Sequence, residues 1–232
     1  MRAASNTGRV RRTRAEEVCE RMRQDILAGD IQPGERLMFP EVCERYSTSV
    51  GVAREALTAL VNQGLVRTVA HLGYSVTPIS TTDLTNLGTT RMLIEPLVLR
   101  ESMRLGGLEW EASVMSAYHV MSRTPHFTDP GHKPVREWAI AHSAFHNALL
   151  SGCGNTRLLE ITRQLSEEAE LYRSWSDVLP LGDRDIAGEH AALLEAAFSG
   201  DCEHAAELLR LHIERTVNSI LKSLEAGENE RE

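Results

Sequence analysis

Four histidines in the last hundred residues constrain most strongly how this chain can fold. His142 and His146 lie in AHSAFH, His190 lies in GEHAALL and His212 lies in LRLHIE. Each falls where the helical periodicity of its segment places an apolar, inward-facing residue. A buried imidazole is unfavourable unless its ring nitrogens are satisfied. The fold must therefore satisfy all four rings, and a shared metal ion would do so.

The remaining histidines fall on polar helix faces, in a loop or in a tight turn: His119, His204, His126, His132 and His71. Four separate core histidines, each hydrogen-bonded locally, are the alternative to a common site. The selective inward placement of four favours the common site. Neutral imidazoles suit Zn²⁺, and Ni²⁺, Cu²⁺ and Fe²⁺ are also compatible.

The charge of the chain is divided unevenly along its 232 residues. Residues 1–78 carry a balance of +2, and the remainder carries −10, within a total of −8. This division is typical of a DNA-binding head joined to a domain with another partner. The sequence has no long uncharged apolar run, no secretory-type start and no CxxC pair, so we expect a cytoplasmic protein with reduced thiols.

The first part of the chain has the pattern of a winged helix-turn-helix over residues 13–78, preceded by a disordered basic arm at 1–12. Ser49 is a plausible N-cap, and Gly29 and Gly64 are expected to end helices. We expect helices at 13–28, 40–46 and 50–63. A hairpin should follow, with strands at 65–69 and 74–77 and a tight turn at 71–73.

The rest of the chain is entirely helical in pattern. Residues 79–226 predict an antiparallel bundle of about six helices, followed by an acidic tail at 227–232. Asp201 is expected to cap the last helix. The expected helices are 81–105, 108–123, 134–151, 155–178, 183–199 and 201–226. The fold class is therefore mainly α.

The second helix of a helix-turn-helix lies in the major groove, with its N-terminal residues facing the base edges. Arg54 is the leading specificity residue, because a guanidinium can bond guanine O6 and N7 together. Its alternative is an ion pair with Glu55 or a carboxylate of the first helix. The other expected DNA contacts lie on the recognition helix, the wing and the arm: Val50, Gly51, Thr58, His71, Gly73, Tyr74, Arg9, Arg11, Arg12 and Arg14. The arm arginines would bind phosphates, or form a solvated tail.

Several segments carry a family resemblance. The N-terminal ones, GDIQPGERL, AREALTALVNQGLV and HLGYSV, resemble the head of GntR-family bacterial transcription regulators. The later ones, RMLIEPLVLRES, HSAFHNALLSGCGN, EHAALLEAAFSGD and LRLHIE, resemble the FCD ligand-binding domain of the FadR subfamily. The recognition helix departs from the family pattern Ser-Arg-Thr-Pro-Val-Arg-Glu-Ala-Leu. Val50 replaces its first Arg and Val52 its Pro, so one usual DNA-contacting cation is missing.

The resemblance implies a metal site. FCD domains of the metal-binding kind carry Asp-x-x-x-His on one helix and a His on each of two later helices. His146, His190 and His212 match the three histidines, and His142 stands at the Asp position. This replacement removes a negative charge and should favour zinc or nickel over magnesium or manganese. Alternatively, His142 does not ligate, which leaves three histidines and water.

The resemblance also implies a small organic acid effector next to the metal. Arg91 matches an arginine that often faces the effector pocket in this family, and its guanidinium could form a bidentate pair with a carboxylate. A salt bridge with Glu95, one turn on, is the equal alternative. Weaker candidates for the effector pocket are Asn155, Arg163, Tyr172 and Arg173.

These features together predict a metabolite-responsive repressor. A homodimer would bind a near-palindromic operator in double-stranded DNA, because two-fold protein symmetry is mirrored in the DNA. The resemblance to the family implies that effector binding releases the protein from DNA. A metal-dependent hydrolase that uses the histidines is the alternative, since three histidines with an open position are also a catalytic pattern. Glu189 is adjacent to His190, but no general base is obviously placed.

Overall fold

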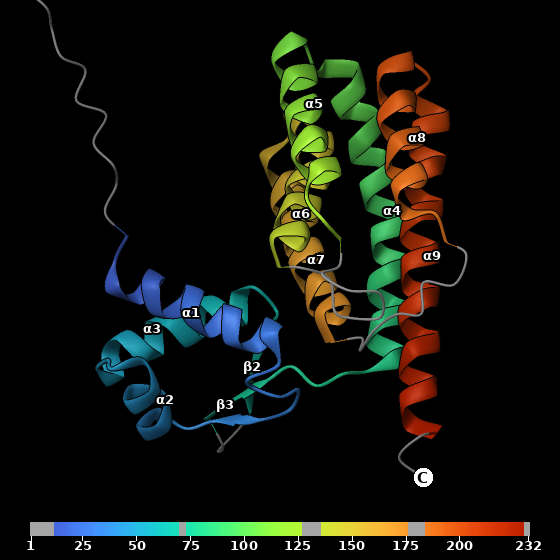
Figure 1. Ribbon diagram of the computed structural model, residues 1–232. Helices are drawn as coiled ribbons and strands as arrows, with labels where there is room; N and C mark the ends of the chain where they lie inside the picture. The colour runs from blue at the N-terminus through green and yellow to red at the C-terminus, as the bar shows by residue number, and fades with distance from the viewer. Residues whose placement is uncertain (1–11, 70–72, 127–135, 176–183, 230–232) are drawn as a thin grey trace, which may run out of the picture. The chain divides into compact units, whose positions relative to one another are not determined.

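The computed structural model describes residues 12–69, 73–126, 136–175 and 184–229. It confirms the expected fold class, with helices throughout and one small sheet near the N-terminus (Figure 1). The chain forms two compact units, residues 1–78 and 79–232. Within the described residues, no helix is both long and apolar enough to cross a membrane.

The N-terminal unit is a winged helix-turn-helix. Its elements are α1 (Arg14–Ala28), β1 (Arg36–Leu37), α2 (Phe39–Tyr46), α3 (Val50–Asn62), β2 (Val66–Val69) and β3 (Gly73–Val76). The three strands form an antiparallel sheet in the order β1-β3-β2. The sequence did not predict β1, because two residues are too few to show an alternating pattern.

Local capping explains where these helices begin and end. The Thr13 hydroxyl accepts a hydrogen bond from the Glu16 amide, and the Glu16 side chain bonds back to the Thr13 amide. Ser49 caps α3 through the Val52 amide, as predicted. Gly29 ends α1 with φ +83°, a conformation that glycine adopts without strain. The recognition helix is thus fixed at its first turn.

The C-terminal unit is a helical domain. Its helices are α4 (Thr81–Leu105), α5 (Leu108–Arg123), α6 (Arg136–Leu150), α7 (Thr156–Trp175), α8 (Ile186–Ser199) and α9 (Cys202–Asn229), with a 3-10 turn at Ser151–Cys153. The bounds of α4 and α5 are those predicted. Asp201 caps α9 through the His204 amide, also as predicted. The predicted ends at 134–135, 176–178 and 183 lie outside the described residues, and 184–185 are not helical. Helix α9 continues to Asn229, into the segment predicted as an acidic tail.

Helix α4 lies between α9 on one side and α5, α6 and α7 on the other, and α4 and α9 pack along each other (Figure 1). Gly88 allows their close approach, because a Cβ at this position would lie only 2.6 Å from Cγ2 of Val217. A core of buried apolar side chains, including Val98, Phe145 and Leu193, joins α4, α6 and α8. This packing brings α6, α8 and α9, the helices that carry the four inward histidines, to one interior point.

Candidate metal centre and nucleic-acid interface

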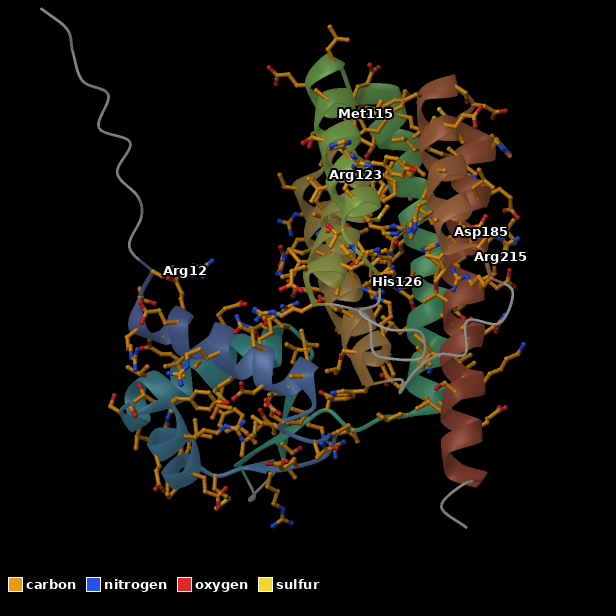
Figure 2. The ribbon with its side chains drawn as sticks, in the orientation of Figure 1. Arg12, Met115, Arg123, His126, Asp185 and Arg215 are labelled. Carbon is orange, nitrogen blue, oxygen red and sulfur yellow. The ribbon has the colours of Figure 1, made fainter. Side chains whose placement is uncertain are left out.

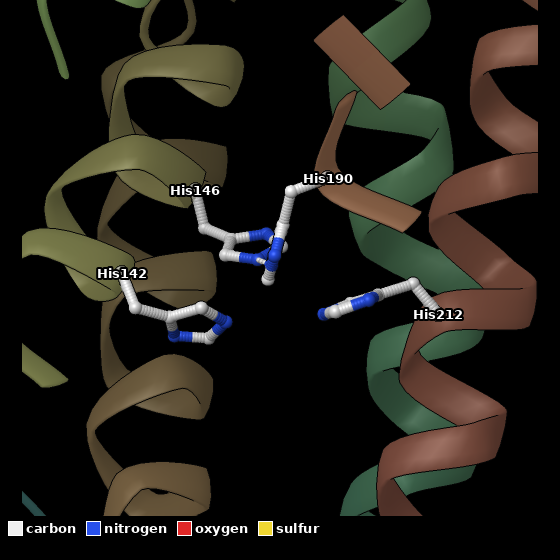
Figure 3. Close-up of side chains that lie close together, drawn as sticks. All are labelled: His142, His146, His190 and His212. Atoms are coloured by element: carbon white, nitrogen blue, oxygen red, sulfur yellow. Dashed lines mark hydrogen bonds between the residues drawn. The ribbon is translucent and has the colours of Figure 1, made fainter. Parts of the chain in front are cut away.

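The four inward histidines converge on one buried point. His142 and His146 come from successive turns of α6, His190 comes from α8 and His212 comes from α9 (Figure 3). All four are buried. One ring nitrogen from each lies within 4.8 Å of the corresponding atoms of the others. The exposed positions of His119 and His204 match their predicted polar faces.

The donor set fits a divalent transition metal. His146 Nε2 and His190 Nε2 lie 3.2 Å apart. Two nitrogens bound to one tetrahedral zinc, each at about 2.0–2.1 Å, would be about 3.3 Å apart. Four imidazole nitrogens are borderline ligands that suit zinc, nickel or copper and offer no oxygen for magnesium or calcium. The residues could therefore hold zinc.

Burial keeps the cluster neutral, which is the state that binds a metal. It lowers the pKa of His142 and His146 well below the usual range, and the neighbouring histidines lower it further. Burial and the proximity of His212 lower the pKa of His190 to about 3. Burial lowers the pKa of His212 as well, although its hydrogen bond to Glu189 partly offsets this. Their lone pairs are thus available at neutral pH.

Glu189 orients one of these rings from outside the cluster. His212 Nδ1 lies 2.8 Å from Glu189 Oε2. A carboxylate can only accept, so Nδ1 carries the proton and Nε2 is left as the free acceptor. Metal-ligating histidines are commonly held in this way by a carboxylate.

The Glu189 carboxylate is itself held by two arginines. Arg184 bonds both of its oxygens, at 2.9 and 2.7 Å, and Arg215 approaches Oε1 at 3.2 Å. Arg184 also donates to the His212 carbonyl and the Thr216 hydroxyl. Arg215 lies on the same side of the unit as Asp185, at the start of α8 (Figure 2). Burial raises the pKa of Glu189, but His212 and Arg184 outweigh it, so the net pKa is lowered and the carboxylate stays ionised.

Sequence reasoning noted Glu189 only as a neighbour of His190, and it missed Arg184 and Arg215. The contact between Glu189 and His212 joins two helices, and periodicity along one helix carries no signal of it. The contact of His126 with Trp138, which lies on the same helix face as His142, is a second feature that the sequence did not reveal. The Trp138 ring stacks on His142 at 4.7 Å and on His126 at 3.8 Å, so aromatic rings cover the cluster on this side.

Two arginines adjoin the cluster. Arg91 forms a buried bridge to Glu95 through Nε and Nη2, at 2.6 and 3.2 Å, which is the alternative that the sequence left open. Nη1 lies outside this bridge. Burial and the proximity of Arg91 lower the pKa of Arg173 to about 10, so it remains charged at neutral pH. Both arginines contribute to the lowered pKa of His146, and both line one small cavity together with Thr216, one turn after His212.

The other three effector candidates have structural partners elsewhere. Asn155 is exposed, and its side-chain oxygen accepts from the Arg157 and Leu158 amides at the start of α7. The Arg163 guanidinium binds two glutamates of its own helix. The Tyr172 hydroxyl donates to Asp83 at 2.7 Å. The structure therefore gives these three residues local roles and brings Arg91 and Arg173 together.

On the recognition helix, the candidate DNA-contacting residues share an exposed face. Val50, Gly51, Arg54 and Thr58 are all exposed, and the Thr58 hydroxyl donates to the Arg54 carbonyl at 2.8 Å. The Arg54 guanidinium lies over the Phe39 ring, 5.4 Å from its centroid. Among the described residues it forms no ion pair with Glu55 or with a carboxylate of α1. The predicted alternative of such an ion pair is not observed.

The wing and arm candidates differ in exposure and in the contacts that they make. Gly73 is exposed, with φ +89°, and a Cβ there would meet nothing within 4 Å. Tyr74 is half-buried against Phe39, and Arg12 is exposed at the start of α1. Arg14 has a structural role, because its guanidinium donates to the Tyr46 and Ser47 carbonyls at the end of α2. Three predicted residues lie outside the described ones: Arg9, Arg11 and His71.

Comparison with known proteins identifies the two units. Residues 14–76 match the family model of "Bacterial regulatory proteins, gntR family", and residues 86–215 match that of the FCD domain. The chain belongs to the GntR family of regulators and carries an FCD domain. This confirms the resemblance stated on sequence motifs. The GntR match spans the winged helix-turn-helix, and the FCD match contains all four clustered histidines.

Two curated relatives are similar over most of the chain. BphR of Paraburkholderia xenovorans, an uncharacterized HTH-type transcriptional regulator, is 37% identical over 211 residues, which cover 90% of this chain and 86% of BphR. The HTH-type transcriptional repressor GlaR of Escherichia coli is 34% identical over 196 residues, which cover 83% and 89%. This GntR regulator is therefore not an enzyme, and the hydrolase alternative is set aside.

Solved structures show the same fold. A GntR regulator from Rhodococcus sp. RHA1 superposes with a TM-score of 0.72 at 25% identity, covering 90% of this chain and 98% of that one. McbR/YncC of E. coli superposes with a TM-score of 0.73 at 16% identity, covering 91% and 99%. The second likeness concerns the fold alone.

Proposed function

We propose that this GntR regulator is a repressor that binds a near-palindromic operator as a homodimer and is released by a small carboxylate held beside a zinc ion. The observation that carries this proposal is the cluster of four buried, neutral histidines in a domain joined to a DNA-binding head. The relative GlaR is a transcriptional repressor, which supports repression as the direction of control.

In this proposal zinc is bound by His142, His146, His190 and His212, and it supplies a positive centre that attracts an anionic effector. Nickel is the runner-up, because imidazole sites bind both metals. Glu189 keeps the His212 lone pair directed at the cluster. The neutral His142, at the position where related FCD sites carry Asp, leaves the bound ion with its full charge.

The first prediction concerns Glu189. Glu189→Gln keeps the shape of the side chain but removes the charge that holds His212 and Arg184. Zinc affinity should fall about 10–100-fold, the usual effect of losing such an outer partner. Competition with a chromophoric chelator measures it. Glu195→Gln, an exposed carboxylate on the same helix, is the matched control. Equal zinc affinity of Glu189→Gln and the wild type would argue against the assignment.

Dimer formation is supported by an apolar stripe on α4. Leu93 is 72% exposed and Leu97 is 49% exposed, one turn apart on the same face. Exposed large apolar side chains grouped in this way are typical of an interface. A two-fold dimer would present two recognition helices to two half-sites of the operator.

The second prediction concerns operator recognition. Arg54→Ala should abolish specific operator binding and leave weak, salt-dependent binding to random duplexes, because only base-edge contacts carry sequence information. The measurement is a footprint on the operator selected by the wild-type protein from a random duplex pool. A variant that still protects the same site would refute the role of Arg54.

The effector proposal rests on Arg91 and Arg173. Both line a small cavity of about 10 Å³ together with Thr216, which is space for a single water. An organic acid would therefore bind only if side chains move, and this movement offers a route to the DNA-binding unit. A carboxylate beside two arginines and a metal would gain charge-assisted hydrogen bonds.

The third prediction follows from this arrangement. A panel of small mono- and dicarboxylates is titrated into the zinc-loaded protein bound to its selected operator. At least one should weaken operator binding about 5–150-fold, the usual range of allosteric coupling. Arg173→Gln should lose the response to the acid and still bind zinc. Arg163→Gln is the control: Arg163 binds only glutamates of its own helix, so this variant should keep both the response and the zinc. A panel in which no acid changes operator affinity contradicts the mechanism.

A further inference from the structure

The Arg54 side chain has an unusual set of neighbours for an exposed arginine. Its guanidinium lies over the Phe39 ring at 5.4 Å, and Phe39 is the first residue of α2. Within the described part of the chain, this guanidinium has no hydrogen bond or ion pair. Two other arginines of this unit bind a carboxylate or carbonyls, as Arg45 binds Asp25 and Arg14 binds Tyr46, whereas Arg21 lies over the Tyr46 ring at 5.2 Å.

The Phe39 ring is itself held in place by the wing. Tyr74 meets it edge to face, with centroids 5.9 Å apart and planes at 81°, which is a favourable aromatic geometry. Tyr74 lies in β3, the central strand of the sheet, where it is paired with Leu37 on one side and Thr68 on the other. A half-buried aromatic ring is therefore fixed between the wing and the recognition helix.

Stacking on an aromatic face suits an arginine that must read a base. The Arg54 guanidinium carbon lies over the ring, and among the described residues its N–H groups have no hydrogen-bond partner, so they can donate to DNA. Guanine O6 and N7 are bound by this edge. An arginine already held in one orientation also loses less rotational freedom when it binds DNA.

We propose that Phe39 is a positioning residue for operator recognition: its ring, braced by Tyr74, holds the Arg54 guanidinium with its hydrogen-bonding edge free for a base. This inference rests on the proposed reading of DNA by Arg54. It links the wing to sequence recognition through protein contacts alone, in addition to any contact that the wing makes with DNA.

The test is a double-mutant cycle on the intact protein. Phe39→Leu removes the aromatic face and keeps an apolar side chain, and Phe39→Tyr restores the face. Each is made alone and together with Arg54→Ala. The probes are the duplex selected by the wild-type protein and a random duplex of equal length. The readout is the ratio of the two affinities, with the salt dependence of random-duplex binding measured in parallel.

We expect Phe39→Leu to lower the affinity ratio about 3–10-fold and to leave random-duplex affinity and its salt dependence unchanged. Phe39→Tyr should keep the wild-type ratio, and Phe39→Leu should have no further effect when Arg54 is already alanine. Phe39→Met serves as a second non-aromatic variant if Phe39→Leu does not fold, as judged by its helical circular dichroism.

Two results overturn the inference. If Phe39→Leu keeps the wild-type ratio, or lowers it equally with and without Arg54, Phe39 does not act through Arg54. In that case the loss caused by Arg54→Ala alone still supports the proposed function. If Arg54→Ala itself leaves the ratio unchanged, base reading by Arg54 fails, and the positioning role of Phe39 fails with it.

Discussion

The burial of four imidazoles at one point is the constraint on which the helical domain depends. A charged imidazole is unfavourable in this buried environment, because water cannot solvate it. Burial therefore lowers the pKa values of His142, His146 and His190, and the rings stay neutral. Neutral rings in contact have both lone pairs and N–H groups to satisfy. A divalent ion would satisfy the lone pairs, and the pairing of His212 with Glu189 shows how one N–H is satisfied from outside.

The two units divide the work of a regulator. In the proposed function, the helical domain binds an anion near Arg91, which is paired with Glu95, and Arg173, which lines the same small cavity. The winged unit presents a recognition helix whose Arg54 guanidinium has no hydrogen-bond partner among the described residues. In the proposed mechanism, an acid can enter the small cavity lined by Arg91 and Arg173 only if side chains of α4, α7 or α9 move.

Much of this arrangement could be predicted from the sequence, because periodicity reports which face of a helix is buried. The bounds of α4 and the inward placement of His212 follow from it. The pairing of Glu189 with His212 could not be predicted, because periodicity does not say which helices meet. Likewise, the basic character of Arg14 suggested a phosphate contact, whereas the structure uses it to bind carbonyls at the end of α2.

The central claim is that the four histidines form one zinc site. X-ray absorption at the zinc edge, on protein purified without chelator and loaded with one equivalent of zinc, tests it most directly. We expect a shell of four nitrogen ligands at about 2.0–2.1 Å with the imidazole scattering pattern, and the loss of one imidazole in His142→Ala. A shell dominated by sulfur or by oxygen, or a spectrum unchanged by His142→Ala, would contradict it.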